Sequence, residues 1–304
     1  MSFSLTPEAN TTTARAIFLT GSARTGSTMM GRLLNSLADV ELTSDPSFLF
    51  CLFPMIATMD GSQWRYLFES YLFEEHLMQG LQGRGLNLNR VDLTSAVHSK
   101  PLEEIERRLG RSYRRREVIS IAQRTRPAFK LTDMMAFTGR FQSYYPEATA
   151  LIMVRRPESV IASTLAKGWY SDNDLNLIGS IWPFKHVGGS KVPFWVPDAD
   201  VERFVRMTEL ERCVLYYVRM HEALVPRENC IVIDYDSFVV DSDRSFKRLT
   251  DRLGCSFGPL TASLLNGVKE EDKNRDISFE GIDRGLVERM YVVADQCKRL
   301  SSQW

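Results

Sequence analysis

One loop of the chain has the residue types and the spacing of an anion-binding site. The loop 21–28, with the sequence GSARTGST, lies between an expected strand, Ala16–Thr20, and an expected helix, Thr28–Leu37. A strand, a glycine-containing loop and a helix N-terminus in this order bind anions, because free backbone N–H groups and the helix dipole both favour negative charge. Gly21 and Gly26 let the backbone approach a ligand without an intervening Cβ. We therefore expect a phosphate-like ligand here, although an ordinary turn between strand and helix can also contain two glycines.

This loop differs from the P-loop of nucleoside triphosphatases at one deciding position. Ser27 stands where the motif G-x-x-x-x-G-K-[ST] has the lysine that reaches the β- and γ-phosphates. The basic residue is instead Arg24, within the loop. The site is thus not typical of a kinase that uses a triphosphate and magnesium. A P-loop kinase with a degenerate lysine and a nucleotide-binding protein without catalysis remain alternatives.

A second strand–turn–helix combines an arginine with a hydroxyl group. Thr149–Val154 is an expected strand, and Arg155 follows it directly. Pro157 then begins a helix that carries Ser163 two turns later. An arginine and a serine that converge from a strand end and a helix can hold one phosphate, although both side chains can equally be solvated.

The two segments together resemble the sulfotransferases that use 3′-phosphoadenosine 5′-phosphosulfate (PAPS), in the bacterial-type branch with a carboxylate base. The family's first motif, [KR]-[ST]-G-[ST]-[ST], corresponds to residues 24–28, RTGST. Its second motif, R-x-P followed by a serine eight positions beyond the arginine, corresponds to Arg155 through Ser163. A third block, residues 230–238 leading to Gly254, is similar to the family's strand ending in Tyr-Glu/Asp and its later Leu-Gly helix end. The order of the blocks also matches.

The resemblance implies a donor, a product and a set of binding residues. PAPS would be the donor and 3′-phosphoadenosine 5′-phosphate (PAP) the product, with no metal ion. Arg24 and the rest of the first motif would hold the 5′-phosphosulfate: Thr25, Gly26, Ser27 and Thr28. Arg155 and Ser163 would hold the 3′-phosphate. A late basic loop that contains Arg275 and Arg284 would close over the 3′-phosphate, and of these two we expect Arg284.

The resemblance also implies three catalytic residues. The block 40–48 is similar to a family block whose glutamate acts as general base, and Asp45 takes that position with a side chain one methylene shorter. Lys130, at the end of an expected strand, would neutralise the transferring oxygens, and Arg24 the leaving group. Asp133 is the second candidate for the base and His98 a third. The alternatives are that Asp45 caps a turn and that Lys130 is an ordinary lysine at a strand end.

The elements that must position these residues alternate along the chain. Expected strands at 16–20, 128–131, 149–154 and 230–235, with a short one at 40–43, are separated by helical patterns. Helices are expected at 28–37, 101–109, 157–167, 201–224, 242–253 and 286–300, with Gly254 as a helix C-cap. This alternation predicts an α/β fold, P-loop-like, with three layers and a central, mostly parallel sheet.

We expect residues 1–304 to form one sulfotransferase domain with a flexible N-terminus, residues 1–15. Two aromatic-rich segments, 44–90 and 169–200, fit no regular element, and we interpret both as insertions that line an acceptor pocket. The alternative is that their aromatic side chains form satellite cores.

Composition limits the remaining classes of function. Lys+Arg and Asp+Glu both number 38, so no global field attracts nucleic acid. The 5 cysteines form no C-x-x-C pair, and no signal peptide is expected before Ala16. No run of apolar residues is long enough to span a membrane. We therefore expect a cytoplasmic enzyme without an integral membrane segment. Its acceptor would be a hydroxyl of a small molecule, carbohydrate or glycolipid, while its oligomeric state stays open.

Overall fold

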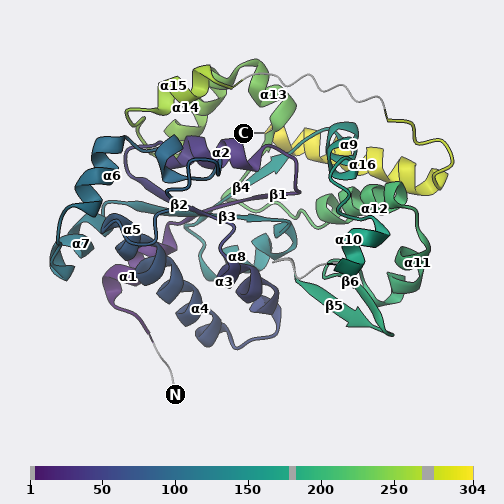
Figure 1. The fold of residues 1–304 in the computed structure, drawn as a ribbon, viewed down its shortest axis with the longest axis horizontal. Coiled ribbons are helices and arrows are strands. Elements are labelled where there is room, and N and C mark those ends of the chain that lie inside the picture. The colour runs from purple at the N-terminus through teal and green to yellow at the C-terminus, as the bar shows by residue number, and fades with distance from the viewer. Residues whose placement is uncertain (1–3, 178–182, 269–276, 304) are drawn as a thin grey trace.

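The computed structural model describes residues 4–177, 183–268 and 277–303, and its centre is a five-stranded parallel sheet (Figure 1). In spatial order the strands are β2 (Val40–Ser44), β3 (Arg126–Thr132), β1 (Ile17–Gly21), β4 (Thr149–Val154) and β7 (Cys230–Asp234). Every neighbouring pair in this sheet is parallel. The predicted α/β fold with a parallel sheet is confirmed, and all five expected strands are present.

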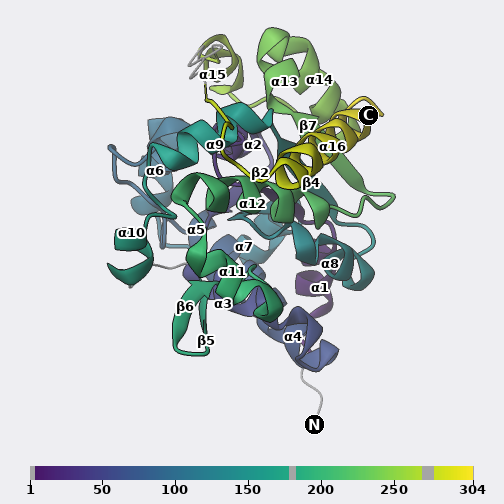
Figure 2. The same cartoon turned by 90° about the vertical axis from the view of Figure 1, so that its right-hand side faces the viewer.

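Helices cover both faces of the sheet, because the strands are apolar on both sides (Figures 1 and 2). Ile17 and Leu19 share one apolar cluster with α2 (Ser27–Asn35) and α14 (Ser242–Leu253). Phe18 points to the opposite face, towards α3 (Ser47–Leu52), α4 (Gly61–Glu69) and α8 (Thr138–Tyr144). Near β4 and β7 that face is covered by α9 (Pro157–Leu165), α12 (Glu209–Glu222) and α16 (Arg284–Ser301). The remaining α-helices are α1 (Pro7–Ala14), α5 (Gln79–Leu81), α6 (Leu102–Leu109), α7 (Arg115–Ala122), α10 (Asp172–Leu177), α11 (Val201–Arg206), α13 (Tyr235–Val240) and α15 (Thr261–Asn266).

Most expected helices are present, but the long one at 201–224 is wrong. It is divided into α11 and α12, and Thr208 caps the second helix. The Thr208 hydroxyl accepts the Glu211 N–H while the Glu211 carboxylate accepts the Thr208 N–H, which is a capping box. The expected C-cap at Gly254 is present, with a left-handed φ of 63°.

The N-terminus is ordered in part, contrary to the expectation for residues 1–15. The Thr6 side chain accepts the Ala9 N–H, and Pro7 is the first residue of α1. An N-cap and a proline in the first turn therefore begin the helix. Ala9 and Thr13 are buried, and α1 contacts β3 and the segment that follows α4. Burial of one face is what holds this helix in place.

Segment 44–90 is mainly helical, which corrects the expectation of an irregular loop. It contains α3, a short 3-10 helix at Phe53–Ala57, α4, a π-helix at Ser70–Met78, and α5. Phe53, Trp64 and Phe68 are buried and pack in one aromatic cluster with Phe18 and Phe129 of the sheet. Most of these rings therefore form core, as the alternative interpretation had it.

The described part of segment 169–200 also contains regular elements and core side chains, contrary to the expectation of an irregular segment. The strands β5 (Phe184–Val187) and β6 (Ser190–Pro193) form a hairpin after α10. Tyr170 and Trp195 pack on Phe204 and Tyr216, so these aromatic side chains also belong to a core. Trp182 lies outside the described residues.

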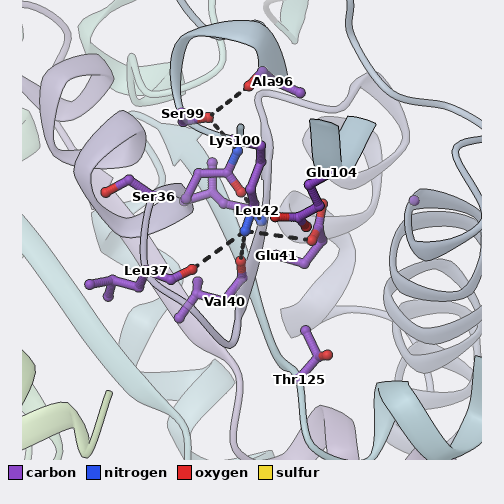
Figure 3. A network of polar contacts seen from close by, with 12 residues as sticks. Ser36, Leu37, Val40, Glu41, Leu42, Ala96, Ser99, Lys100, Glu104 and Thr125 are labelled. Carbon is purple, nitrogen blue, oxygen red and sulfur yellow. Dashed lines mark hydrogen bonds and ion pairs between the residues drawn. The ribbon is translucent and has the colours of Figure 1, made fainter. Parts of the chain in front are cut away.

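A buried ionic cluster fixes the edge strand β2 (Figure 3). The Glu41 carboxylate accepts two hydrogen bonds of 2.9 Å from the Arg108 guanidinium, and the Lys100 ammonium lies 3.8 Å from it. Lys100 also donates to the carbonyl groups of Val40 and Leu37 (Figure 3). Burial alone would raise the pKa of Glu41, but the two cations outweigh it and lower this pKa to about 2.

No helix in the described ranges is long and apolar enough to cross a lipid bilayer. All five cysteines are free thiols.

Substitution Glu41→Gln should destabilise the fold by about 3–5 kcal/mol at pH 7, because it removes the carboxylate beside buried Lys100 and leaves buried Arg108 with only Glu104 of its two carboxylate partners. The stabilising effect of the ionised Glu41 is complete above the unfolded pKa of 4.5 and is lost as pH falls towards about 2. The difference in urea unfolding free energy between wild type and variant should therefore shrink from pH 6 to pH 3. Glu106→Gln on the exposed face of α6 is the control. A loss at pH 7 no larger than that of the control would contradict this account.

Candidate active site

The register of the sheet brings three loops to one edge. Gly21, the last residue of β1, pairs with Thr132 of β3 on one side and with Met153 of β4 on the other. The chain segments that follow these three residues therefore leave the sheet side by side, at the carboxyl ends of the strands. In open α/β sheets this edge is where ligands bind.

The loop 21–28 has room only for glycine at its two glycine positions. Gly26 has a left-handed φ of 86°, and an added Cβ would lie 2.2 Å from the Tyr235 ring. An added Cβ on Gly21 would lie 2.5 Å from the Met153 carbonyl oxygen. Gly26 is the N-cap of α2 and no side chain caps this helix, so the N–H groups of its first turn are left for a ligand.

The two predicted anion motifs meet in space. The Arg24 Nε donates a hydrogen bond of 2.8 Å to the Ser163 Oγ, which joins the β1–α2 loop to α9. The Arg24 side chain is exposed, and its guanidinium carbon lies 6.0 Å from the centre of the Trp169 ring. Arg24 of the first motif therefore contacts Ser163 of the second, and its side chain is accessible to a ligand from solvent.

Arg155 is held in place by residues after β7. Its Nε lies 3.5 Å from a carboxylate oxygen of Asp236, and its guanidinium stacks 4.3 Å from the centre of the Tyr235 ring. Its Nη1 also donates to the Arg24 carbonyl at 3.4 Å. Sequence reasoning missed Asp236, although this residue lies in the block 230–238 that carries part of the resemblance.

The predicted base and the predicted lysine are partners. Lys130 donates to the Asp45 Oδ2, and the Lys130 side chain is only 4% exposed against 26% for that of Asp45. The Asp45 Oδ1 accepts two hydrogen bonds of 3.0 Å from Thr132, one from the backbone N–H and one from the hydroxyl. These contacts fix the orientation of a partly exposed carboxylate at the end of the sheet. Thr132 is a positioning residue that sequence reasoning did not identify.

Asp133, the second candidate base, is a support of the anion loop. It is only 3% exposed. Its Oδ1 accepts the Ala23 N–H at 3.0 Å and the Tyr216 O–H at 2.5 Å. Burial raises the pKa of Asp133 to about 7 in spite of these hydrogen bonds. Asp133 is thus buried and bonded to the loop through Ala23, and its Oδ1 already accepts from two donors.

Backbone strain is concentrated at this edge. Among the described residues, three that are not glycine have positive φ: Arg24 at 72°, Asp45 at 48° and Asp133 at 64°. Such conformations persist only where tertiary contacts impose them, and they cluster at functional sites. All three residues are site candidates from the sequence, so the strain is an independent indication of function.

The other predicted site residues lie outside this arrangement. Arg284 is 92% exposed at the start of α16 and pairs with Glu288 of the same helix. Within the described residues no contact joins Arg284 to the two motifs, and Arg275 lies outside those residues. The His98 ring bonds to the Arg90 carbonyl in an exposed loop. In the part of the chain that the structure describes, no group of three or more His, Cys, Asp or Glu side chains could hold a metal ion.

The role of Asp133 predicts different effects for two substitutions. Asp133→Asn keeps the Oδ1 acceptor and tolerates a left-handed backbone. Asp133→Ala removes the acceptor of the buried Tyr216 O–H, while the Ala23 N–H keeps its bond of 2.6 Å to the Tyr216 hydroxyl. We expect the alanine variant to lose about 1–3 kcal/mol of stability and the asparagine variant much less. Thermal denaturation measures both.

The raised pKa of Asp133 also predicts how the stability of the two proteins, wild type and Asp133→Asn, depends on pH. Because burial raises the pKa of Asp133 from 3.8 to about 7, its contribution to stability is present below the unfolded value and is lost as pH rises through about 7. The asparagine variant should lack this fall between pH 5 and pH 8. Equal loss in both variants, or an unchanged pH profile in the asparagine variant, would contradict the role given to Asp133.

Comparisons with known proteins identify the family of this chain. Among solved structures it is similar to a sulfotransferase domain from the curacin biosynthetic pathway, with 13% identity, coverage of 93% of this chain and 97% of that one, and a TM-score of 0.49. It is also similar to a sulfotransferase domain of the Synechococcus PCC 7002 olefin synthase (14% identity, 95% of each chain, TM-score 0.43) and to a sulfotransferase from Alicyclobacillus acidocaldarius (15% identity, 95% and 94%, TM-score 0.40). No curated protein matches the chain. A model of the Sulfotransferase family matches residues 16–259. That match covers most of the sequence, and the chain therefore belongs to the sulfotransferase family.

Proposed function

We propose that this protein transfers a sulfuryl group from PAPS to a hydroxyl group of a small-molecule, carbohydrate or glycolipid acceptor. Family membership supports sulfuryl transfer in general. The observation that carries the choice of donor is the 2.8 Å hydrogen bond between Arg24 and Ser163. It joins the β1–α2 loop to α9, which carry the two predicted anion motifs, and a nucleotide with phosphates at both its 5′ and 3′ positions needs two such motifs close together.

The loop 21–28 is suited to the 5′-phosphate, which is the leaving group. Its N–H groups lie at the start of α2, and the hydroxyl groups of Ser27 and Thr28 are in the same turn. Arg24 adds a planar guanidinium that can bind an anionic oxygen in bidentate fashion. Thr25 serves the loop itself, because its hydroxyl donates to the Ser22 carbonyl at 2.7 Å.

Ser163 and Arg155 are suited to the 3′-phosphate. Ser163 faces Arg24, and Arg155 is oriented by Asp236 and by the Tyr235 ring. The Asp236 carboxylate keeps Arg155 aligned at the strand end, so the guanidinium does not have to be ordered when a phosphate binds. Arg284 is not part of this assignment, because within the described residues it pairs with Glu288 and no contact joins it to either motif.

Asp45 is suited to accept the proton of the acceptor hydroxyl. PAPS supplies the sulfuryl group, whose bond to the 5′-phosphate breaks as the acceptor oxygen bonds to sulfur. Lys130 pairs with the Asp45 carboxylate, and Thr132 fixes its orientation. Lys130 also brings a buried positive charge to the edge where negative charge develops on the transferring oxygens.

The role of Ser163 is tested with two nucleotides that differ only in the 3′-phosphate. Ser163→Ala removes a hydrogen bond to a charged group and should weaken PAP binding about 10- to 100-fold. Binding of adenosine 5′-monophosphate should hardly change. Isothermal titration calorimetry gives both dissociation constants, and Ser143→Ala, an exposed serine of α8, is the control. Equal effects on both nucleotides would overturn the assignment of the 3′-phosphate.

The role of Asp45 is tested by separating binding from turnover. Asp45→Asn should lower kcat about 10²- to 10⁴-fold, the usual contribution of a general base, and should leave PAP affinity unchanged. Mass spectrometry of PAPS with a library of hydroxyl acceptors measures the transfer. Asp39→Asn, an exposed carboxylate at the opposite end of β2, is the control. Full activity of Asp45→Asn would contradict the assignment, and binding of PAP without transfer by the wild type would favour a non-catalytic nucleotide-binding protein.

A further inference from the structure

A polar cavity of about 150 Å³ lies beside the edge strand β2. We call it the edge cavity, and its lining includes Thr43, Ser44, Tyr71, His76, Asn87 and Thr94. Ser44, the residue directly before Asp45, belongs to this lining, so the cavity lies beside the end of β2 that leads into the proposed base. This inference rests on the proposed function, because it concerns the acceptor of that reaction.

The backbone of β2 turns hydrogen-bonding groups towards this cavity. The Asp45 N–H donates to the Lys130 carbonyl and the Arg126 N–H donates to the Asp39 carbonyl. In a parallel ladder the odd-numbered residues of β2 therefore bond to β3, and the even-numbered residues point away from the sheet. Leu42 and Ser44 both line the cavity.

Some backbone groups on the outer edge of β2, the edge away from β3, already have hydrogen-bond partners. Lys100 donates to the Val40 carbonyl, as Figure 3 shows, and the Asn35 Oδ1 accepts the Leu42 N–H at 3.0 Å. In the described part of the chain, no partner is found for the Leu42 carbonyl or for the Ser44 N–H. One acceptor and one donor thus remain open, directly before Asp45. An open edge this short cannot pair with an extended peptide over several residues, but it can bond to hydroxyl groups.

The side chains of the cavity add further donors and acceptors. The His76 Nε2 donates to the Glu41 carbonyl at 2.9 Å, so the Nδ1 of the neutral ring is an acceptor. Burial lowers the pKa of His76, which keeps the ring neutral. The Tyr71 and Thr43 hydroxyl groups both line the cavity, and a hydroxyl group can donate as well as accept. Groups of this kind match hydroxyls, which both donate and accept.

An aromatic pair borders the same place. The Phe48 ring stacks on the Tyr71 ring with centroids 5.2 Å apart, and Phe48 is 42% exposed. Phe48 is the second residue of α3, two positions after Pro46. An exposed ring beside a polar cavity offers an apolar face to a ligand whose other side carries hydroxyl groups.

We propose that the acceptor is a sugar-like polyol that places one hydroxyl at Asp45, bonds its neighbouring hydroxyls in the edge cavity and packs a C–H face on Phe48. In the reaction the acceptor oxygen forms a bond to sulfur, the bond from sulfur to the 5′-phosphate oxygen breaks, and the hydroxyl proton passes to Asp45. The products are a sugar sulfate ester and PAP. A flat apolar polycycle would leave the donors and acceptors of the cavity unsatisfied.

The test compares three classes of acceptor with PAPS as donor: methyl glycosides of glucose, galactose and mannose, p-nitrophenol, and a short tyrosine-containing peptide. Mass spectrometry should detect transfer to at least one glycoside, with a higher kcat/KM than for the phenol or the peptide. Phe48→Ala and Tyr71→Phe should each raise the KM for that glycoside about five- to tenfold. PAP affinity should be unchanged, and Tyr113→Phe, outside the cavity, is the control.

Three results would overturn the proposal. They are preferred transfer to the phenol or the peptide, transfer to one of these two acceptors but to no glycoside, and a glycoside KM that neither cavity variant changes. Failure of the proposed function is distinguishable from all three, because the wild-type protein would then either not bind PAP or bind it and transfer to none of the three classes of acceptor.

Discussion

The site depends on one constraint, the parallel register of β1 between β3 and β4. Gly21 pairs with both Thr132 and Met153, so the loops after the three strands begin at the same edge. Residues far apart in the sequence thereby become neighbours: Arg24 reaches Ser163 from one side, and Asp45 reaches Thr132 from the other. A shift of one strand by a single residue would turn its side chains to the opposite face and separate these groups.

The loops at this edge are held in strained conformations by tertiary contacts. Arg24, Asp45 and Asp133 have positive φ, and each belongs to a segment fixed from outside. Tyr216 and Asp133 bind the Ala23 N–H, Tyr235 fills the space beside Gly26, and Thr132 binds Asp45. Such contacts keep donors and charges in place before a ligand binds, which lowers the cost of organising them during a reaction. The buried Glu41 cluster does the same for β2, the strand that presents Asp45.

The sequence predicted the parts of this structure that depend on local patterns. The strands, most of the helices and the strand–loop–helix form of the two predicted anion motifs follow from short periodic runs and loop signals. The helices of segment 44–90 were missed because their aromatic residues suggested a ligand wall, although their spacing also fits a helix packed on the core. The break at Thr208 had a visible capping-box signal. By contrast, no local spacing reveals the pairing of Arg108 with Glu41, or of Tyr216 with Asp133, because only the assembled sheet brings these residues together.

The central claim is that one nucleotide occupies two anion-binding motifs at this edge. Phosphorus-31 NMR of PAP titrated with the protein tests it most directly, because the 5′- and 3′-phosphates give separate resonances. The account predicts that both resonances shift and saturate together at the same protein concentration. A shift of the 5′ resonance alone, or of neither, would contradict it.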